Sequence, residues 1–440
     1  MKTACVKNKQ RHLLEETLKT TKKRRFLRHL LTGISLFCGI GATAPAMAAT
    51  TAPAFITVGT LYASSGVFAE ISMPVYKGLK LWADQVNAEG GIYVKPYDKK
   101  IPVKLIAYDD QSSPSTATTL YNQLITQDKV DILTADSGSV LTSVAVPLAR
   151  EHHVLLFDQT GTGPKFFSAD NKYIVLLDNT VSSVWPQRLS EFLTKVAPEH
   201  GIHRIAILYS TNDFTGSQAK SVHDYIEKHG KNTSIVFYSG TPTSTSNYFV
   251  LLHRIQATHP DAVIEMGYPT NAIAFTKNLR DSGMKFKMVF TIYSGLESEL
   301  LQKTAGVPAV LNNFTYIPPS NSNYPATFGM NISQFKTAYH QLYGANADVG
   351  MNAVAGYNTG LIIQKTLANA DSMQALALRK AVFTLSDKLT TLAGAFKLAD
   401  DGSQIGELLP IGQLQGNDQS VTLVPVYPAD IATAKPIFGH

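Results

Sequence analysis

Short apolar runs alternate with longer amphipathic stretches along most of the chain. We expect the apolar runs to form buried strands, and apolar residues recurring at helical spacing to form the helices between them. Val75, Leu79 and Trp82 show this spacing, and Gly90-Gly91 should end their helix. The expected strands are residues 55–61, 101–108, 130–135, 154–157, 204–209, 234–238, 262–266 and 287–292; the expected helices are residues 113–127, 140–152, 182–196, 214–228, 248–258 and 270–282.

This repeated order of strand and helix predicts an α/β fold. Parallel strands need helical crossovers, so each set of repeats should build a parallel sheet covered by helices on both faces. The pattern restarts near residue 180, which predicts two doubly wound lobes joined by a multi-stranded hinge. Residues 331–385 read mostly as helices, and residues 394–427 as short strands. The expected division is a leader (1–48), lobe I (49–178), lobe II (179–314), a return to lobe I (315–395), and a last segment for hinge, lobe II and tail (396–440).

Positive charge is concentrated at the start of the chain. The 440 residues carry a formal net charge of +6, but residues 1–48 hold ten basic and two acidic residues. The remainder has 29 basic and 31 acidic residues, a net charge of −2, so composition gives no support for nucleic-acid binding. With 44% hydrophobic residues the remainder is long enough and apolar enough for two folded lobes.

The leader has the order of a signal peptide. Its basic stretch ends at Arg28, an apolar stretch at residues 30–40 follows, and Ala46-Met47-Ala48 has the small-x-small pattern of a cleavage site. A basic amphipathic or DNA-binding arm is the alternative, and it does not explain this order. The apolar stretch is too short for a stable membrane anchor. We therefore expect a periplasmic protein, cleaved near Ala48 and exported by the general secretory route, with the twin-arginine route as the alternative.

Both cysteines, Cys5 and Cys38, lie in this leader. Phe37 precedes Cys38, where a lipoprotein signal needs a small residue, so we expect no lipid anchor. After cleavage no thiol would remain for disulfides, nucleophilic catalysis or metal binding.

Hydroxyl groups and glycines follow three of the expected strands of lobe I. Ligands bind beyond the carboxyl ends of strands in such folds, and free N–H groups at a helix start favour a carboxylate or another small anion. Ser139 and Thr162 would also be helix caps. Capping alone would explain any one of these loops. The candidate ligand-binding residues of lobe I are Ser65, Ser139, Thr160, Gly161 and Thr162.

Aromatic residues follow the strands of lobe II. Phe214, Tyr268 and Tyr293 are candidate ligand contacts, and with Tyr62, Phe68 and Trp185 they would line an apolar cleft between the lobes. Packing in the core or hinge is the alternative for each ring.

Known catalytic and metal motifs are absent from the sequence. It has no Gly-x-Ser-x-Gly, no His-Glu-x-x-His and no phosphate-binding loop. Gly161-Thr162-Gly163 begins like a dinucleotide motif, but Phe166 stands where the third glycine is needed. The His152-His153 pair lacks a third ligand at suitable spacing. We expect no enzyme activity, no cofactor and no metal.

Several short motifs occur in a characteristic order between residues 55 and 425. They are Val58-Gly59-Thr60-Leu61, Asn87-Ala88-Glu89-Gly90-Gly91-Ile92, Tyr108-Asp109-Asp110, Ser137-Gly138-Ser139, Gly161-Thr162-Gly163-Pro164 and Leu279-Arg280-Asp281-Ser282-Gly283. In this order the sequence resembles the exported solute-binding proteins of branched-chain amino acid and amide ABC transporters, which have the type I periplasmic binding fold. The resemblance implies a monomer that binds a small molecule and delivers it to a permease and its ATPase.

The resemblance also implies roles for individual residues. Ser139, Thr160, Thr162 and the Gly161 amide would hold the ligand carboxylate. An acid usually holds the ligand ammonium where Tyr293 stands here, and Glu265, a strand away, is a poor substitute. The resemblance therefore favours an amino-acid-like ligand with an aromatic or apolar body, or an amide.

Three alternatives share parts of this pattern. A periplasmic sensing module for a signalling system would have the same fold. An exported α/β hydrolase would need a nucleophile with a nearby base, and a repressor would need a helix-turn-helix where the leader stands.

Overall fold

A computed structural model describes residues 51–318, 321, 324–347 and 349–439. The expected signal peptide lies outside these residues, as do both cysteines, so export and cleavage near Ala48 stay predictions. From Thr51 onward the chain forms one unit. None of the described helices is long and apolar enough to cross a membrane.

The first sheet has five parallel strands in the order β4-β1-β5-β6-β7. Four of them match expected strands. The fifth, β7, was not predicted because it is only three residues long and has no flanking turn signal. Their bounds are β1 Ile56–Tyr62, β4 Val103–Asp109, β5 Ile132–Thr134, β6 Leu156–Asp158 and β7 Ile174–Leu176.

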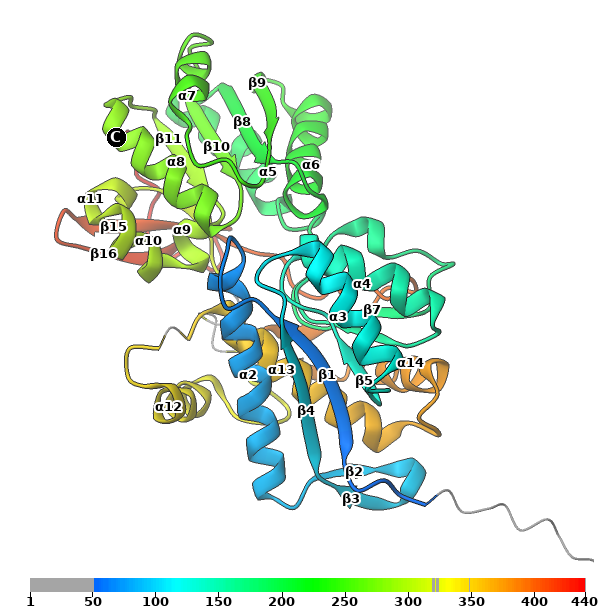
Figure 1. Ribbon diagram of the computed structural model, residues 1–440. Helices are drawn as coiled ribbons and strands as arrows, with labels where there is room; N and C mark the ends of the chain where they lie inside the picture. Colours follow the sequence, from blue (N-terminus) through cyan, green and yellow to red (C-terminus); the bar gives the residue numbers. More distant parts are fainter. Residues whose placement is uncertain (1–50, 319–320, 322–323, 348, 440) are drawn as a thin grey trace, which may run out of the picture. The chain divides into compact units, whose positions relative to one another are not determined.

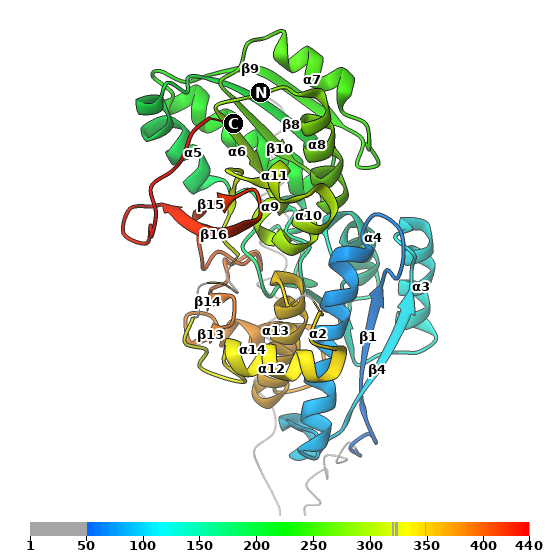
Figure 2. The same cartoon turned by 90° about the vertical axis from the view of Figure 1, so that its left-hand side faces the viewer.

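Helices cover both faces of this sheet, as expected. Helices α3 (Pro114–Thr126) and α4 (Ser139–Glu151) pack on one face. On the other face, α2 (Ala69–Ala88) packs along α13 (Met351–Asn369), a helix from late in the chain (Figures 1 and 2). Two further late helices pack on this pair: α12 (Ile332–Tyr343) contacts α2, and α14 (Ala375–Phe383) contacts α13.

The backbones of α2 and α13 touch. A side chain at Gly78 would overlap the carbonyl of Ala353, and one at Gly356 would overlap the carbonyl of Val75. Glycine is therefore required at both positions for this close packing. The contact attaches residues near 350 to the lobe that begins near residue 55.

The second sheet has seven strands in the order β16-β15-β12-β11-β10-β8-β9. The strands β12, β11, β10, β8 and β9 are parallel, and β15 and β16 extend the sheet as an antiparallel hairpin. The expected α/β fold with two doubly wound lobes is thus confirmed. The bounds are β8 Arg204–Ser210, β9 Ser234–Thr241, β10 Ala262–Met266, β11 Met288–Thr291, β12 Phe314–Tyr316, β15 Ile411–Asn417 and β16 Ser420–Tyr427.

Four helices cover the second sheet, with α5 and α6 on one face and α7 and α8 on the other. The helix expected from residue 182 begins only at Gln187, because residues 182–186 belong to a crossing between the lobes. The bounds are α5 Gln187–Lys195, α6 Asp213–His229, α7 Phe249–Gln256 and α8 Pro269–Ser282, followed by the short helices α9 Tyr293–Leu296, α10 Ser298–Ala305 and α11 Val307–Val310. Two small hairpins are also present, β2 Ile92–Val94 with β3 Lys99–Ile101 and β13 Leu389–Thr391 with β14 Gly394–Phe396. Short 3₁₀ helices occupy Lys95–Tyr97, Pro164–Phe166 and Ala197–His200.

The chain crosses between the sheets after β7, after β12 and after β14. The crossings are hydrogen-bonded to one another and to the strands. The Val181 N–H donates to the carbonyl of Gln404 (2.9 Å), and the Ile317 N–H donates to the carbonyl of Pro410 (2.9 Å). The lobes are therefore joined by ordered backbone, which suits a hinge.

Candidate functional site

Polar loops of the first lobe meet at one edge of its sheet. Strands β1, β5 and β6 are neighbours, so the loops that follow them lie side by side, as the sequence predicted. The hydroxyl oxygens of Ser137 and Thr160 are 3.0 Å apart, and the Thr160 hydroxyl accepts a hydrogen bond of 2.9 Å from the Gly138 N–H.

A row of aromatic rings runs from the second lobe into the first. Trp185 packs edge-on against Phe214 with ring centroids 5.1 Å apart, and Phe214 lies 5.6 Å from Tyr268. Tyr268 then meets the edge of Phe68, in the first lobe, at 5.1 Å. The row places four of the expected aromatic residues side by side between the lobes, whereas Tyr62 stacks on Tyr76 instead.

A small cavity lies beside this row, enclosed by both lobes and the first crossing. The volume within which the centre of a water molecule can move is only about 20 Å³, so the cavity holds a single water. A solute of amino-acid size needs the lobes to move apart first. The lining residues are Ile71, Ser137, Gly138, Thr160, Asn179, Trp185, Phe214, Tyr268, Tyr293, Met351 and Asn352.

Two buried polar side chains distinguish this cavity from larger hollows elsewhere. Neither the Asn179 amide nor the Tyr268 hydroxyl has a hydrogen-bond partner among the described residues, although both side chains are at least 96% buried. Hollows of about 420 Å³ beside Arg280 and about 540 Å³ beside Arg150 contain no such group. Buried polar atoms are normally paired, so the unpaired atoms indicate where a ligand would bind.

Four of the eight candidate residues line this cavity: Thr160, Phe214, Tyr268 and Tyr293. The other four do not. The Ser139 hydroxyl accepts a hydrogen bond of 2.9 Å from the Gly163 N–H, and the Gly161 N–H donates to Asp158 at 2.7 Å. The Thr162 hydroxyl is buried without a partner among the described residues, and Ser65 is exposed.

Two expected helix caps are wrong. Gly138, with φ of 81°, is the N-cap of α4, and Ser139 is already helical. Gly163, not Thr162, precedes the short 3₁₀ helix Pro164–Phe166. The start of α4 consequently has no side-chain cap.

Asn179 and Asn352 line the cavity and were missed by the sequence reasoning. Asn179 lies in the first crossing, and Asn352 comes from α13, about 170 residues later along the chain. The Asn352 amide donates a hydrogen bond of 2.5 Å to Glu297, which is 3% exposed and belongs to the other lobe. Neither asparagine belongs to a motif or a periodic pattern that could have marked it.

The acid considered for a ligand ammonium lies elsewhere. Glu265 does not line the cavity, and burial raises the pKa of its carboxyl to about 8. Glu297 does not line the cavity either, but it accepts a hydrogen bond from Asn352, which does. Tyr293 presents a buried phenol, and burial holds its pKa well above the usual range.

Buried carboxyl groups also follow the strands of the first lobe. Asp110 comes after β4, and burial together with the neighbouring Asp136, after β5, raises the pKa of Asp110 to about 8. Burial raises the pKa of Asp158, at the end of β6, to about 8, and that of Asp178, after β7, to about 7. Among the described residues, no group of three or more His, Cys, Asp or Glu side chains is arranged to hold a metal ion.

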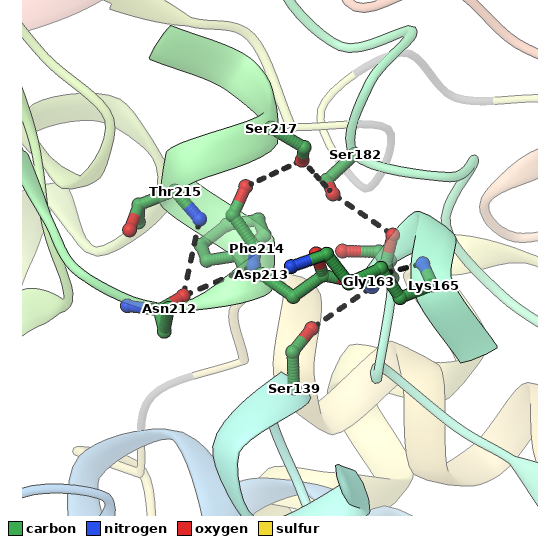
Figure 3. A network of polar contacts seen from close by, with 10 residues as sticks. Ser139, Gly163, Lys165, Ser182, Asn212, Asp213, Phe214, Thr215 and Ser217 are labelled. Carbon is green, nitrogen blue, oxygen red and sulfur yellow. Dashed lines mark hydrogen bonds and ion pairs between the residues drawn. The ribbon is translucent and has the colours of Figure 1, made fainter. Parts of the chain in front are cut away.

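Polar contacts join the lobes at the rim of this region (Figure 3). The Ser182 hydroxyl donates to the carbonyl of Thr162 at 2.8 Å and lies 2.7 Å from the Ser217 hydroxyl of α6. Gly163 lies so close to Asp213 that any side chain there would overlap the carboxylate. Both lobes therefore contact each other directly around the cavity.

Comparisons with known proteins agree with this architecture. A family model described as periplasmic binding protein matches residues 56–419. The leucine-specific-binding protein of Salmonella typhimurium is 26% identical over 230 residues, which cover 52% of this chain and only 59% of that protein. The Leu/Ile/Val-binding protein homolog 8 of Brucella suis is 22% identical over 429 residues, covering 93% of this chain and 98% of that protein.

Solved structures share the fold. An ABC transporter solute-binding protein from R. palustris, in complex with benzoate, superimposes with a TM-score of 0.67 at 16% identity, covering 87% of this chain and 99% of that chain. At this identity the likeness shows the fold alone. The family match over most of the chain establishes that this protein belongs to the periplasmic binding protein family.

Proposed function

We propose that the protein is the periplasmic substrate-binding component of an ABC importer. It captures a small solute that bears a carboxylate or an amide, amino-acid-like with an aromatic or apolar body, and has no enzyme activity. Its partners are a membrane permease and an ATPase. Residues 49–178 and 315–395 serve as lobe I, residues 179–314 as lobe II, and residues 396–440 as hinge, lobe II and tail.

The observation that carries this proposal is the cavity shared by the two lobes. Its walls include Trp185 and Phe214, which favour an apolar ligand body, and its unpaired groups on Asn179 and Tyr268 favour a polar end. Small-molecule sites typically combine such apolar walls with few polar anchors. The names of two similar proteins, which bind leucine and benzoate, fit the same combination of a carboxylate and an apolar body.

The proposed mechanism is a clamp. The ligand enters when the lobes separate by bending at the three crossings, because the present cavity admits only one water. A ligand that contacts both lobes then favours the closed form. The closed form is the one that docks on the permease.

Ligand-induced thermal stabilisation tests this function. The purified protein is unfolded and refolded to remove bound solute, then melted with leucine, isoleucine, phenylalanine, benzoate, benzamide or urea. A ligand present at about a hundred times its Kd should add about 2.7 kcal/mol to the free energy of unfolding. Stabilisation by a carboxylate or an amide supports the proposal, and no response to any of the six contradicts the proposed ligand class.

Three variants test the lobe I assignment separately. Thr160→Ala should weaken binding of the responding solute, because Thr160 lines the cavity, whereas Ser139→Ala and Thr162→Ala remove hydroxyl groups that do not line it and should have smaller effects. If Thr160→Ala binds that solute as tightly as the parent, Thr160 does not hold the ligand.

A further inference from the structure

The cavity between the lobes has an uncharged lining. None of the described residues that line it is an Asp, Glu, His, Lys or Arg, and neither Glu265 nor Glu297 belongs to the lining. A charged group that leaves water for such a place meets no opposite charge, and burying an unpaired charge costs far more than burying a neutral polar group. The lining therefore favours a solute whose buried polar end is neutral.

Most polar groups of the lining already have partners inside the protein. The Thr160 hydroxyl accepts a hydrogen bond of 2.9 Å from the Gly138 N–H and lies 3.0 Å from the Ser137 hydroxyl. The Gly138 N–H is thereby used within the first lobe, and Ser139, the first residue of α4, does not line the cavity. The start of α4 therefore offers the cavity no unpaired N–H group from a lining residue.

The side chain of Asn179 is different. Both Nδ2 and Oδ1 lack a hydrogen-bond partner among the described residues, although Asn179 is only 4% exposed. A side-chain amide carries a donor and an acceptor side by side in one plane, and leaving both buried and unpaired is costly. A ligand group that donates and accepts at the same time would satisfy both atoms, whichever way the amide is turned.

The backbone on either side of Asn179 is fixed. The Leu177 N–H donates a hydrogen bond of 3.0 Å to the carbonyl of Asp158 in β6. The Val181 N–H donates one of 2.9 Å to the carbonyl of Gln404, in the third crossing. The amide of Asn179 is thus held by its neighbours and not by bonds of its own, so it is in place before a ligand arrives.

We propose that Asn179 selects a neutral primary carboxamide: its Nδ2 donates to the carbonyl oxygen of the solute, and the NH₂ group of the solute donates to its Oδ1. The inference rests on the proposed solute-binding function and narrows its ligand, a carboxylate or an amide, to the amide. A carboxylate would accept from Nδ2 but bring a second acceptor, with its charge, against Oδ1. An amino acid would bury two charges against one neutral side chain.

The first test measures by calorimetry how tightly the refolded parent binds benzamide, acetophenone, benzoate and L-phenylalanine. Acetophenone has nearly the shape of benzamide and no charge, but a methyl group replaces the NH₂, so it tests the donor of the ligand alone. Benzamide should bind at least about tenfold more tightly than each of the other three. Equal or tighter binding of any of them overturns the proposal.

Asn179→Leu tests the residue. Leucine is similar in size and has no hydrogen-bonding group, so benzamide should bind at least about tenfold more weakly and no more tightly than acetophenone. The melting temperature of the ligand-free variant should not fall, because the Asn179 amide has no partner to lose among the described residues. The proposal is overturned if benzamide keeps its advantage over acetophenone, or if the melting temperature falls.

Asn369→Leu is the matched control. Asn369 is the last residue of α13, is exposed and does not line the cavity. This variant should keep the affinities of the parent, and equal losses in both variants would overturn the specific role of Asn179. If benzoate or L-phenylalanine binds best, the proposed function stands and only the present inference fails. If none of the four binds the parent, the proposed ligand class fails and the inference fails with it.

Discussion

The backbone N–H of Lys165, in the first lobe, donates a hydrogen bond of 2.9 Å to the carboxylate of Asp213, in the second. Asp213 is the first residue of α6, where the helix dipole favours a negative charge. The Lys165 ammonium is 3.6 Å from the same carboxylate, but its side chain is 85% exposed, so this ion pair adds little. The backbone hydrogen bond is the main part of this contact between the lobes.

Removing the charge of Asp213 should loosen the contact between the lobes. In Asp213→Asn the N–H of Lys165 faces a neutral amide, and the closed ligand-free form should lose roughly 1 kcal/mol. The radius of gyration from small-angle X-ray scattering should increase. Asp224→Asn is the control, since Asp224 pairs with Lys220 on an exposed part of the same helix. Equal radii in the two variants would show that the Asp213 contact does not hold the lobes together.

Asn179→Ala should separate binding from stability. The Asn179 amide has no partner to lose among the described residues, so the melting temperature of the ligand-free protein should hardly change. Binding of the responding solute should weaken by about tenfold, measured by calorimetry. In contrast, Asn358→Ala should lower the free energy of unfolding by roughly 1–3 kcal/mol, because the buried Asn358 amide donates a hydrogen bond of 2.7 Å to the carboxyl group of Asp178. An unchanged affinity in Asn179→Ala would remove Asn179 from the site.

Intrinsic fluorescence should report ligand binding through one tryptophan. The chain contains two, Trp185 at the cavity and Trp82, which is fully buried in the core of the first lobe. Solute binding changes the surroundings of Trp185 only, so the emission change should disappear in Trp185→Phe and remain in Trp82→Phe. The reverse result would place the ligand away from the aromatic row.

Stability should fall as the pH rises toward 8. Burial raises the pKa of Asp158 and of Glu265 to about 8, above the values of about 4 expected in the unfolded chain. The stability these carboxyl groups contribute is fully present below about pH 4 and is lost as the pH rises through about 8. Between about pH 4 and about pH 8, each of these carboxyl groups should lower the free energy of unfolding by about 1.4 kcal/mol per pH unit.

Urea unfolding midpoints between pH 5.5 and 8.5 measure this slope. In Asp158→Asn the slope should be smaller, because a neutral amide replaces the carboxyl and can still accept the Gly161 N–H. Glu151→Gln, at an exposed position, should keep the slope of the parent. If the Asp158 variant and the parent have identical slopes, Asp158 does not titrate as proposed.

Much of the fold could be read from the chain because it depends on local patterns. Buried strands such as Ala262–Met266 are apolar runs, interrupted there only by Glu265, and their repetition with helices implies parallel sheets. The order of neighbouring strands then brings Ser137 and Thr160 together at one edge. Even the aromatic residues of the second lobe could be located, since they directly follow strands.

Two helix caps could not be predicted from the local sequence. Ser139 and Thr162 are good capping residues, but a shift of one residue puts glycines at both helix starts. The exact start of a helix depends on how its first turn packs, and at α4 that turn lies against Tyr268 of the other lobe.

The two lobes, the kinds of residues at the strand ends and the family could all be inferred from local sequence patterns. Which of those residues share a cavity depends on how the whole chain packs. Asn179 and Asn352 reach it from a crossing and from a helix held against α2 by Gly78 and Gly356. Such placements depend on contacts between residues hundreds of positions apart. Side-chain directions and burial at these contacts follow from packing the whole chain, and no local pattern encodes them.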